Sequence, residues 1–312
     1  MQMKKTLIVV DCDDATLTQD LCAAFASYPS VQAILPSHPH ASAAEVACCW
    51  FPDPLLLSHS PDLKLVQAAS AGVDHLPATL FTRDIPLCRV VDDNFRHGMF
   101  EYALWGVLNF QRYFDRARRH QQQKQWQLYP QRPNTEYRVG VMGLGEIGGY
   151  IAQQLSLLGY PVSGWSRSEK KITGVSGYVG YQQLDAFCHS LDVVINVLPL
   201  TEQTRGLIAT PFLQKLPPGA ALINCGRGEH MVNDDVRAAL DQGQLCGALL
   251  DVFPVEPLPV TDPLWEHPRV TITPHMASSA QVSVIAAQLV DNITRLQQQR
   301  PLRHQVDTQH GY

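Results

Sequence analysis

The chain has 312 residues, of which 45% are hydrophobic and 17% are charged, and its formal net charge is −5. This length and composition are ordinary for a folded globular protein with two cores, and they do not indicate a disordered chain. The net negative charge argues against a broad nucleic-acid surface, and no apolar run approaches the roughly 20 residues that a membrane-spanning helix needs. We therefore expect neither nucleic acid nor a membrane as a partner.

The number and spacing of the cysteines indicate a reducing compartment. Eight are present without any C-x-x-C pair, and Cys48 and Cys49 adjoin within an apolar run. The first apolar run ends at Asp11, too early for the core of a signal peptide. Because unpaired thiols are at risk in an oxidising compartment, the sequence predicts reduced, buried thiols, a cytoplasmic location and no metal site.

Short apolar runs alternate with helical or loop segments through the first hundred residues. These strand candidates lie at 7–10, 31–35, 45–50, 63–67 and 87–91. They predict a small parallel α/β unit, in which strands alternate with helices.

A second alternation begins near Arg138, with strand candidates at 139–142, 162–165, 193–197, 220–224, 248–250 and 270–272. A helix candidate at 280–297 follows the last of them and is expected to return to the first unit. We predict two doubly wound parallel-sheet domains: a smaller flavodoxin-like substrate domain at 1–98 and 279–312, and an inserted Rossmann-type dinucleotide domain at 99–278. The ligand cleft is expected between the two domains.

The glycine motif of the second unit is Gly143-Leu144-Gly145-Glu146-Ile147-Gly148. It follows the apolar strand at 139–142 and opens a helix, which is the context that gives a G-x-G-x-x-G motif its meaning. Glycine lets the backbone turn tightly and approach a pyrophosphate, whose charge the free N–H groups of the new helix stabilise. The motif predicts a dinucleotide site that includes Gly143, Gly145, Glu146, Ile147 and Gly148.

A helical segment is predicted from about Gly98 to Gln125. Phe100, Leu104 and Leu108 form one apolar face, while Trp105 and Phe110 make the opposite side apolar too. Two apolar sides favour a subunit interface over a helix buried wholly between domains.

Three polar residues stand in or beside loops that follow predicted strands: Arg227, Glu256 and His275. Ligands of open α/β sheets bind at the carboxyl ends of the strands. Reduction of a 2-oxo acid needs a proton donor and a fixed cation for the carboxylate, and histidine and arginine suit these two tasks. We assign His275 as acid in reduction and base in oxidation, Glu256 as its charged partner, and Arg227 as the clamp on substrate.

The sequence resembles the D-isomer-specific 2-hydroxyacid dehydrogenases over nearly its whole length, most closely their glyoxylate and hydroxypyruvate reductases. The resemblance rests on the glycine motif, the loops of Arg227, Glu256 and His275, and the segments at 50–52, 69–75, 99–102, 165–167, 198–207 and 263–270. It implies that Arg227, Glu256 and His275 are catalytic, and that the chain forms a homodimer through the segment after Gly98. It further implies substrate contacts from Trp50, Ala71 and Gly72, and cofactor contacts from Leu198, Pro199 and Asp251.

The choice between NAD and NADP follows from the end of the strand at 162–165. That strand runs into Ser166 and Arg167, with Lys170 and Lys171 beyond, and we expect no acid there to repel a 2′-phosphate. Ser166 can donate to one phosphate oxygen and Arg167 can pair with it, so NADP(H) is expected over NAD(H). The alternative is that Arg167 is a solvated turn residue.

The expected substrate is a small 2-oxo acid, with glyoxylate and hydroxypyruvate foremost by resemblance. Two alternatives stay open: a reductase of a bulkier 2-oxo acid, and a non-catalytic protein that binds NADP(H) as a sensor.

Overall fold

The computed structural model describes residues 5–73 and 75–307, and the chain divides into two compact units. The first comprises residues 1–95 and 279–312, and the second comprises residues 96–278. The predicted boundary at residues 98 and 99 and the observed one at 95 and 96 both fall within α3 (Asp93–Gln111). Each unit is described by itself below.

The first unit is built on a parallel sheet of five strands in the order β2-β1-β3-β4-β5, which is the flavodoxin-like order. The strands are β1 (Thr6–Cys12), β2 (Val31–Ile34), β3 (Val46–Trp50), β4 (Leu65–Ala68) and β5 (Leu87–Cys88). Its helices are α1 (Ala15–Phe25), α2 (Leu56–His59) and α9 (Val282–Gln297), with short 3₁₀ turns at η1 (Ala41–Ala43) and η2 (Ala78–Leu80).

The last helix, α9, completes the core of this first unit. Leu21 and Phe25 of α1 pack with Ile285 and Leu289 of α9 over buried strand residues such as Val10. The final helix thus belongs to the first unit. Amphipathic spacing in both helices explains the packing, since each buries only one face.

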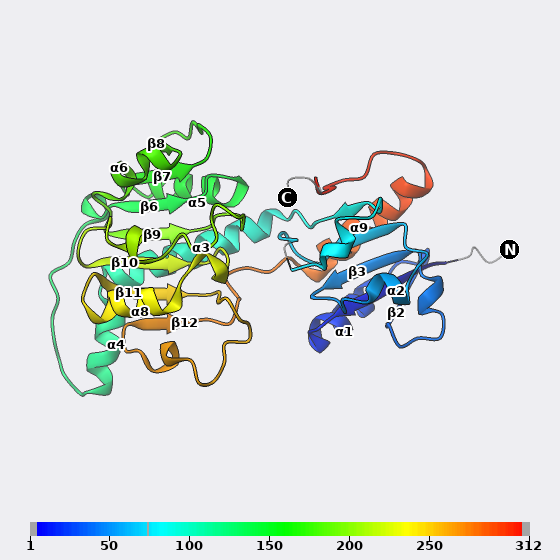
Figure 1. Cartoon of the computed structure of the whole chain (residues 1–312), viewed down its shortest axis with the longest axis horizontal. Coiled ribbons are helices and arrows are strands. Elements are labelled where there is room, and N and C mark those ends of the chain that lie inside the picture. Colours follow the sequence, from blue (N-terminus) through cyan, green and yellow to red (C-terminus); the bar gives the residue numbers. More distant parts are fainter. Residues whose placement is uncertain (1–4, 74, 308–312) are drawn as a thin grey trace. The chain divides into compact units, whose positions relative to one another are not determined.

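The second unit is built on a parallel sheet of seven strands in the order β12-β11-β10-β9-β6-β7-β8, which Figure 1 shows as one stack. The strands are β6 (Val139–Met142), β7 (Val162–Ser166), β8 (Val175–Val179), β9 (Val193–Asn196), β10 (Ala220–Asn224), β11 (Leu245–Leu250) and β12 (Val270–Ile272). The order reverses between β6 and β9, as in a Rossmann domain, so the predicted fold class is confirmed.

Helices and 3₁₀ turns connect these strands. The helices are α3, α4 (Phe114–Gln122), α5 (Glu146–Leu157), α6 (Leu184–Cys188), α7 (Thr210–Leu213) and α8 (Asn233–Asp241). The 3₁₀ turns are η3 (Asn134–Glu136), η4 (Tyr181–Gln183), η5 (Gly228–His230) and η6 (Pro263–Glu266). Central strands β6, β9 and β10 are wholly buried, which explains their continuous apolar sequences.

The helical segment predicted from about Gly98 to Gln125 consists of two helices rather than one. The chain leaves α3 at Gln111, Tyr113 adopts the left-handed conformation (φ 59°), and a separate helix α4 begins at Phe114. Helix α3 packs so tightly on its own sheet that a Cβ on Gly106 would lie 2.6 Å from Ile223 Cδ1. Its own unit therefore covers much of the surface that the sequence assigned to a partner.

Exposed apolar side chains gather instead after α4. Every residue from 121 to 128 is exposed, and Trp126 and Leu128 are 96% and 83% accessible. Arg119 anchors α4 by donating to the Pro268 carbonyl at 2.9 Å, just before β12.

No helix in the described part of the chain combines the length and hydrophobicity that crossing a bilayer requires.

Candidate active site

The glycine motif forms the turn between β6 and α5, as its spacing predicts. Gly143 has a φ of +95°, and a Cβ on Gly148 would lie 1.8 Å from the Gly143 carbonyl oxygen. In contrast, nothing lies within 4 Å of a Cβ built on Gly145, the N-cap residue of α5. The strand and helix are thus packed tightly on one side, while the free N–H groups of Glu146 and Ile147 open on the other. These residues fit a dinucleotide pyrophosphate.

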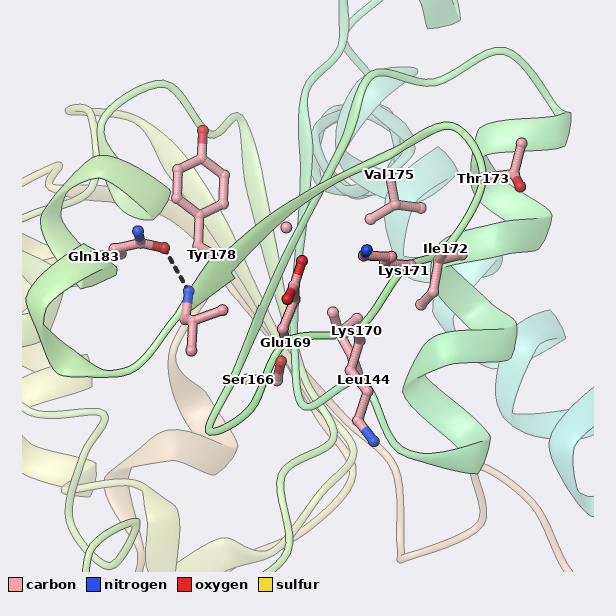
Figure 2. Close-up of a pocket in the computed structure, with 12 residues that line it drawn as sticks. Leu144, Ser166, Glu169, Lys170, Lys171, Ile172, Thr173, Val175, Tyr178 and Gln183 are labelled. Atoms are coloured by element: carbon pink, nitrogen blue, oxygen red, sulfur yellow. Dashed lines mark hydrogen bonds between the residues drawn. The ribbon is translucent and has the colours of Figure 1, made fainter.

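Ser166 ends β7 and lies at the rim of a cavity of about 750 Å³, which Figure 2 shows together with Glu169, Lys170 and Lys171. The Ser166 hydroxyl donates to the Ser168 carbonyl at 2.7 Å, and the Arg167 side chain is exposed. Contrary to the expectation from the sequence, an acid does lie close to Ser166, because Glu169 is one of the residues that line this cavity. Lys170 and Lys171, which also line the cavity, offset that negative charge.

His275 and Glu256 form an ion pair beyond the carboxyl ends of β12 and β11. His275 Nδ1 lies 2.7 Å from Glu256 Oε2, and Glu256 Oε1 accepts the Phe253 N–H at 2.8 Å. The hydrogen bond to Glu256 raises the pKa of His275, while burial and the positive charge of Arg227 act in the opposite direction. Because Nδ1 faces a carboxylate, Nε2 is the nitrogen left to meet a reacting group.

The turn that carries His275 is held by Asp251, at the end of β11. His275 has a φ of +52°, in the left-handed region that few non-glycine residues adopt. Asp251 Oδ1 accepts the Met276 N–H and Oδ2 the Ala277 N–H, both at 2.9 Å, and Oδ1 also accepts the Thr273 hydroxyl at 2.6 Å. This series of hydrogen bonds extends to α3, where the Tyr102 hydroxyl lies 2.6 Å from Thr273 Oγ1. Asp251 thus fixes the His275 turn, a role that the resemblance did not imply.

Arg227 lies in the loop after β10, beside the loop of Glu256. Its Nη1 donates to the Gly226 carbonyl at 2.7 Å. The next residue, Gly228, has no room for a side chain, since a Cβ there would lie 1.8 Å from the backbone carbonyl carbon of Phe253. This close approach brings together the loops that carry Arg227 and Glu256.

Leu198 and Pro199 follow β9 at the same edge of the sheet. The Leu198 N–H donates to Asn196 Oδ1 at 3.3 Å, and the Pro199 carbonyl accepts from the Thr204 hydroxyl at 2.8 Å. The segment beside the expected cofactor is therefore fixed by polar side chains.

The first unit carries Trp50, the last residue of β3, and Ala71 and Gly72, which follow β4. The Ser70 hydroxyl donates to the Gly72 carbonyl at 2.8 Å, which shapes the turn. Trp50 packs edge-on against Phe51, whose ring centroid lies 4.7 Å from that of His75. Asp74, within the same motif, lies outside the described residues. That these residues meet Arg227 and His275 around one substrate stays a prediction.

The sequence interpretation missed a buried polar cluster beneath the Arg227 loop, made by Asn196, Asn224 and His230. Two of its members end apolar strands, in Val-Val-Ile-Asn and Ala-Leu-Ile-Asn. An amide at the carboxyl end of a buried parallel strand is a signal that could have been used, because such ends border the ligand crevice.

Comparison with known proteins identifies the family. The model of the NAD-binding domain of D-isomer-specific 2-hydroxyacid dehydrogenases matches residues 104–277. A family protein from Klebsiella pneumoniae is 62% identical, with a TM-score of 0.96 and 99% of each chain covered. A Xanthobacter autotrophicus family protein solved with NADPH is 36% identical, with a TM-score of 0.87 and 99% of each chain covered. An NADPH-dependent glyoxylate/hydroxypyruvate reductase from Sinorhizobium meliloti, solved with NADP, is 33% identical, with a TM-score of 0.90; 99% of this chain and 100% of that chain are covered.

The chain therefore belongs to the D-isomer-specific 2-hydroxyacid dehydrogenase family. It is an oxidoreductase whose cofactor is a nicotinamide dinucleotide and whose substrate is a small hydroxy or oxo acid.

Proposed function

We propose that the chain reduces small 2-oxo acids with NADPH, converting glyoxylate to glycolate and hydroxypyruvate to glycerate, with His275 as the proton donor. The observation that carries this proposal is the 2.7 Å pair of His275 Nδ1 and Glu256 Oε2, which raises the pKa of the imidazole beside the positive charge of Arg227. The NADPH-dependent activity of the Sinorhizobium meliloti reductase supports the choice of cofactor and substrate.

The bound cofactor supplies the hydride. Under this proposal the amides at the start of α5 hold its pyrophosphate, and Ser166 and Arg167 hold the 2′-phosphate. Leu198, Pro199 and Asp251 border the nicotinamide end.

The substrate is held and protonated by the chain itself. Arg227 binds its carboxylate through two parallel hydrogen bonds, with help from the backbone amides of Ala71 and Gly72 and the shape of Trp50. His275 gives its Nε2 proton to the carbonyl oxygen, and Glu256 stabilises the charged imidazole before that transfer.

The decisive experiment follows the absorbance of NADPH as glyoxylate, hydroxypyruvate, pyruvate or phenylpyruvate is added. We expect the fastest loss with glyoxylate or hydroxypyruvate. Faster loss with phenylpyruvate would favour the reductase of a bulkier 2-oxo acid, and NADPH binding without turnover of any of the four would favour the sensor.

His275→Gln should lower kcat by about 100- to 10,000-fold, the usual contribution of a general acid.

We further propose a homodimer that forms through the segment from about Gly98 to Gln125 and the exposed residues that follow it. Trp126 and Leu128 are the support for this surface, because they lie two positions apart in one exposed segment and large apolar side chains grouped in this way mark an interaction site. We also propose the cytoplasm as the location, since all eight thiols are free, as a reducing compartment maintains them.

A further inference from the structure

The buried cluster at the carboxyl ends of β9 and β10 takes no part in the mechanism above. Asn196, Asn224 and His230 are each 0% exposed, and a fully buried polar side chain is costly unless its hydrogen bonds are made. The cluster lies between the loop of Arg227 and the segment of Leu198 and Pro199.

The hydrogen-bond partners fix the protonation of His230. Its Nε2 lies 3.2 Å from the Pro199 carbonyl, which can only accept, so Nε2 carries a proton. Its Nδ1 lies 3.3 Å from the Arg227 N–H and 2.8 Å from Asn196 Nδ2. Both of these groups are donors, so Nδ1 is the unprotonated acceptor, and the ring is the neutral Nε2–H tautomer.

The orientations of the two amides agree with this assignment. Asn196 Oδ1 accepts the Leu198 N–H, which leaves Nδ2 to donate to Asn224 Oδ1 at 2.8 Å and to His230. Asn224 Nδ2 in turn donates to the Arg227 carbonyl at 3.3 Å. The main chain of Arg227 is thus held on both its N–H and its carbonyl side.

We infer that His230 is a positioning residue that holds two parts of the site by its two ring nitrogens. Nδ1 fixes the backbone from which the Arg227 guanidinium extends, and Nε2–H fixes the Pro199 carbonyl beside the expected cofactor. The inference rests on the proposed function for the roles of Arg227 and Pro199.

Two substitutions separate the two nitrogens. His230→Asn places an amide oxygen near the position of Nδ1 and removes the bond to Pro199. His230→Gln places an amide nitrogen near the position of Nε2 and removes the acceptor for the Arg227 N–H. The readouts are the Kd of NADPH, from its fluorescence, and the Kd of oxalate for the NADP-loaded protein, from calorimetry. His189→Asn, at an exposed histidine of the same unit, is the control.

We expect His230→Asn to raise the Kd of NADPH by on the order of 10-fold and to leave the Kd of oxalate nearly unchanged. His230→Gln should do the reverse, because each variant loses one buried hydrogen bond. If both variants raise both Kd values equally, His230 acts only in packing and the inference is overturned. So would ¹⁵N spectra that show the His230 ring protonated on Nδ1. If the wild-type protein turns over none of the four 2-oxo acids, the proposed function fails, while the two affinities still decide the role of His230.

Discussion

The pair of His275 and Glu256 makes a prediction about pH. The carboxylate raises the pKa of His275, so the imidazole keeps its proton to higher pH than a free histidine. Because reduction needs the protonated form, its rate should be level below this pKa and fall above it. Glu256→Gln should move that fall to lower pH and lower kcat at neutral pH by about 100-fold.

The measurement is the pH profile of kcat/KM for the wild type and the variant. Glu266→Gln, which removes the charge of an exposed glutamate in η6, is the matched control and should leave the profile in place. An unchanged profile for Glu256→Gln would mean that another group supplies the proton.

Arg167 tests the choice between the two cofactors. If its guanidinium pairs with the 2′-phosphate, Arg167→Ala should raise the KM of NADPH by about 10- to 100-fold and leave the KM of NADH nearly unchanged, as for loss of a charge-assisted hydrogen bond. Arg300→Ala, at an exposed arginine of the first unit, is the control. Equal effects on the two cofactors would show that Arg167 is a solvated turn residue.

At the level of single residues, the sequence predicts what a strand-end position and chemical type can carry. The sequence pairs Glu256 with His275 on those grounds, and in the structure His275 Nδ1 lies 2.7 Å from Glu256 Oε2. The role of His230 was out of reach, because it depends on which donors meet each ring nitrogen. The sequence interpretation also overlooked Glu169, whose exposed side chain lines the cavity beside Ser166.

At the level of elements, the turn between β6 and α5 allows two neighbouring glycines to be compared. Gly148→Ala would drive a Cβ into the Gly143 carbonyl, and backbone cannot easily yield, so we expect a loss of about 1–3 kcal/mol in the free energy of unfolding. Gly145→Ala meets nothing within 4 Å and should leave that free energy nearly unchanged, yet raise the Kd of NADPH by placing a methyl group where the pyrophosphate approaches.

Denaturant unfolding and NADPH titration of both variants check this contrast. If the Gly145→Ala protein binds NADPH as tightly as the wild type, the pyrophosphate does not bind at this turn. A Gly148→Ala protein of normal stability would contradict the tight packing of strand against helix.

Helices and strands are predictable where their burial gives the sequence a regular apolar pattern. Strands β6, β9 and β10 are buried on both faces and appear as continuous apolar runs, so the sequence located them. Strand β8 was missed because it is only partly buried and its sequence, Val-Ser-Gly-Tyr-Val, shows no such run. The break at Tyr113 was missed because a left-handed tyrosine has no distinctive sequence signal.

At the level of the whole molecule, the proposed dimer can be tested through the segment after α4. Trp126 and Leu128 are exposed two positions apart, and covering such a group of large apolar side chains with a partner removes apolar surface from water. We expect light scattering to give the mass of two chains at micromolar concentration. Trp126→Ser combined with Leu128→Ser should shift the mass toward one chain, while Val260→Ser, which removes a 92% exposed valine elsewhere in the same unit, should leave it unchanged. A wild-type mass equal to one chain would overturn the dimer.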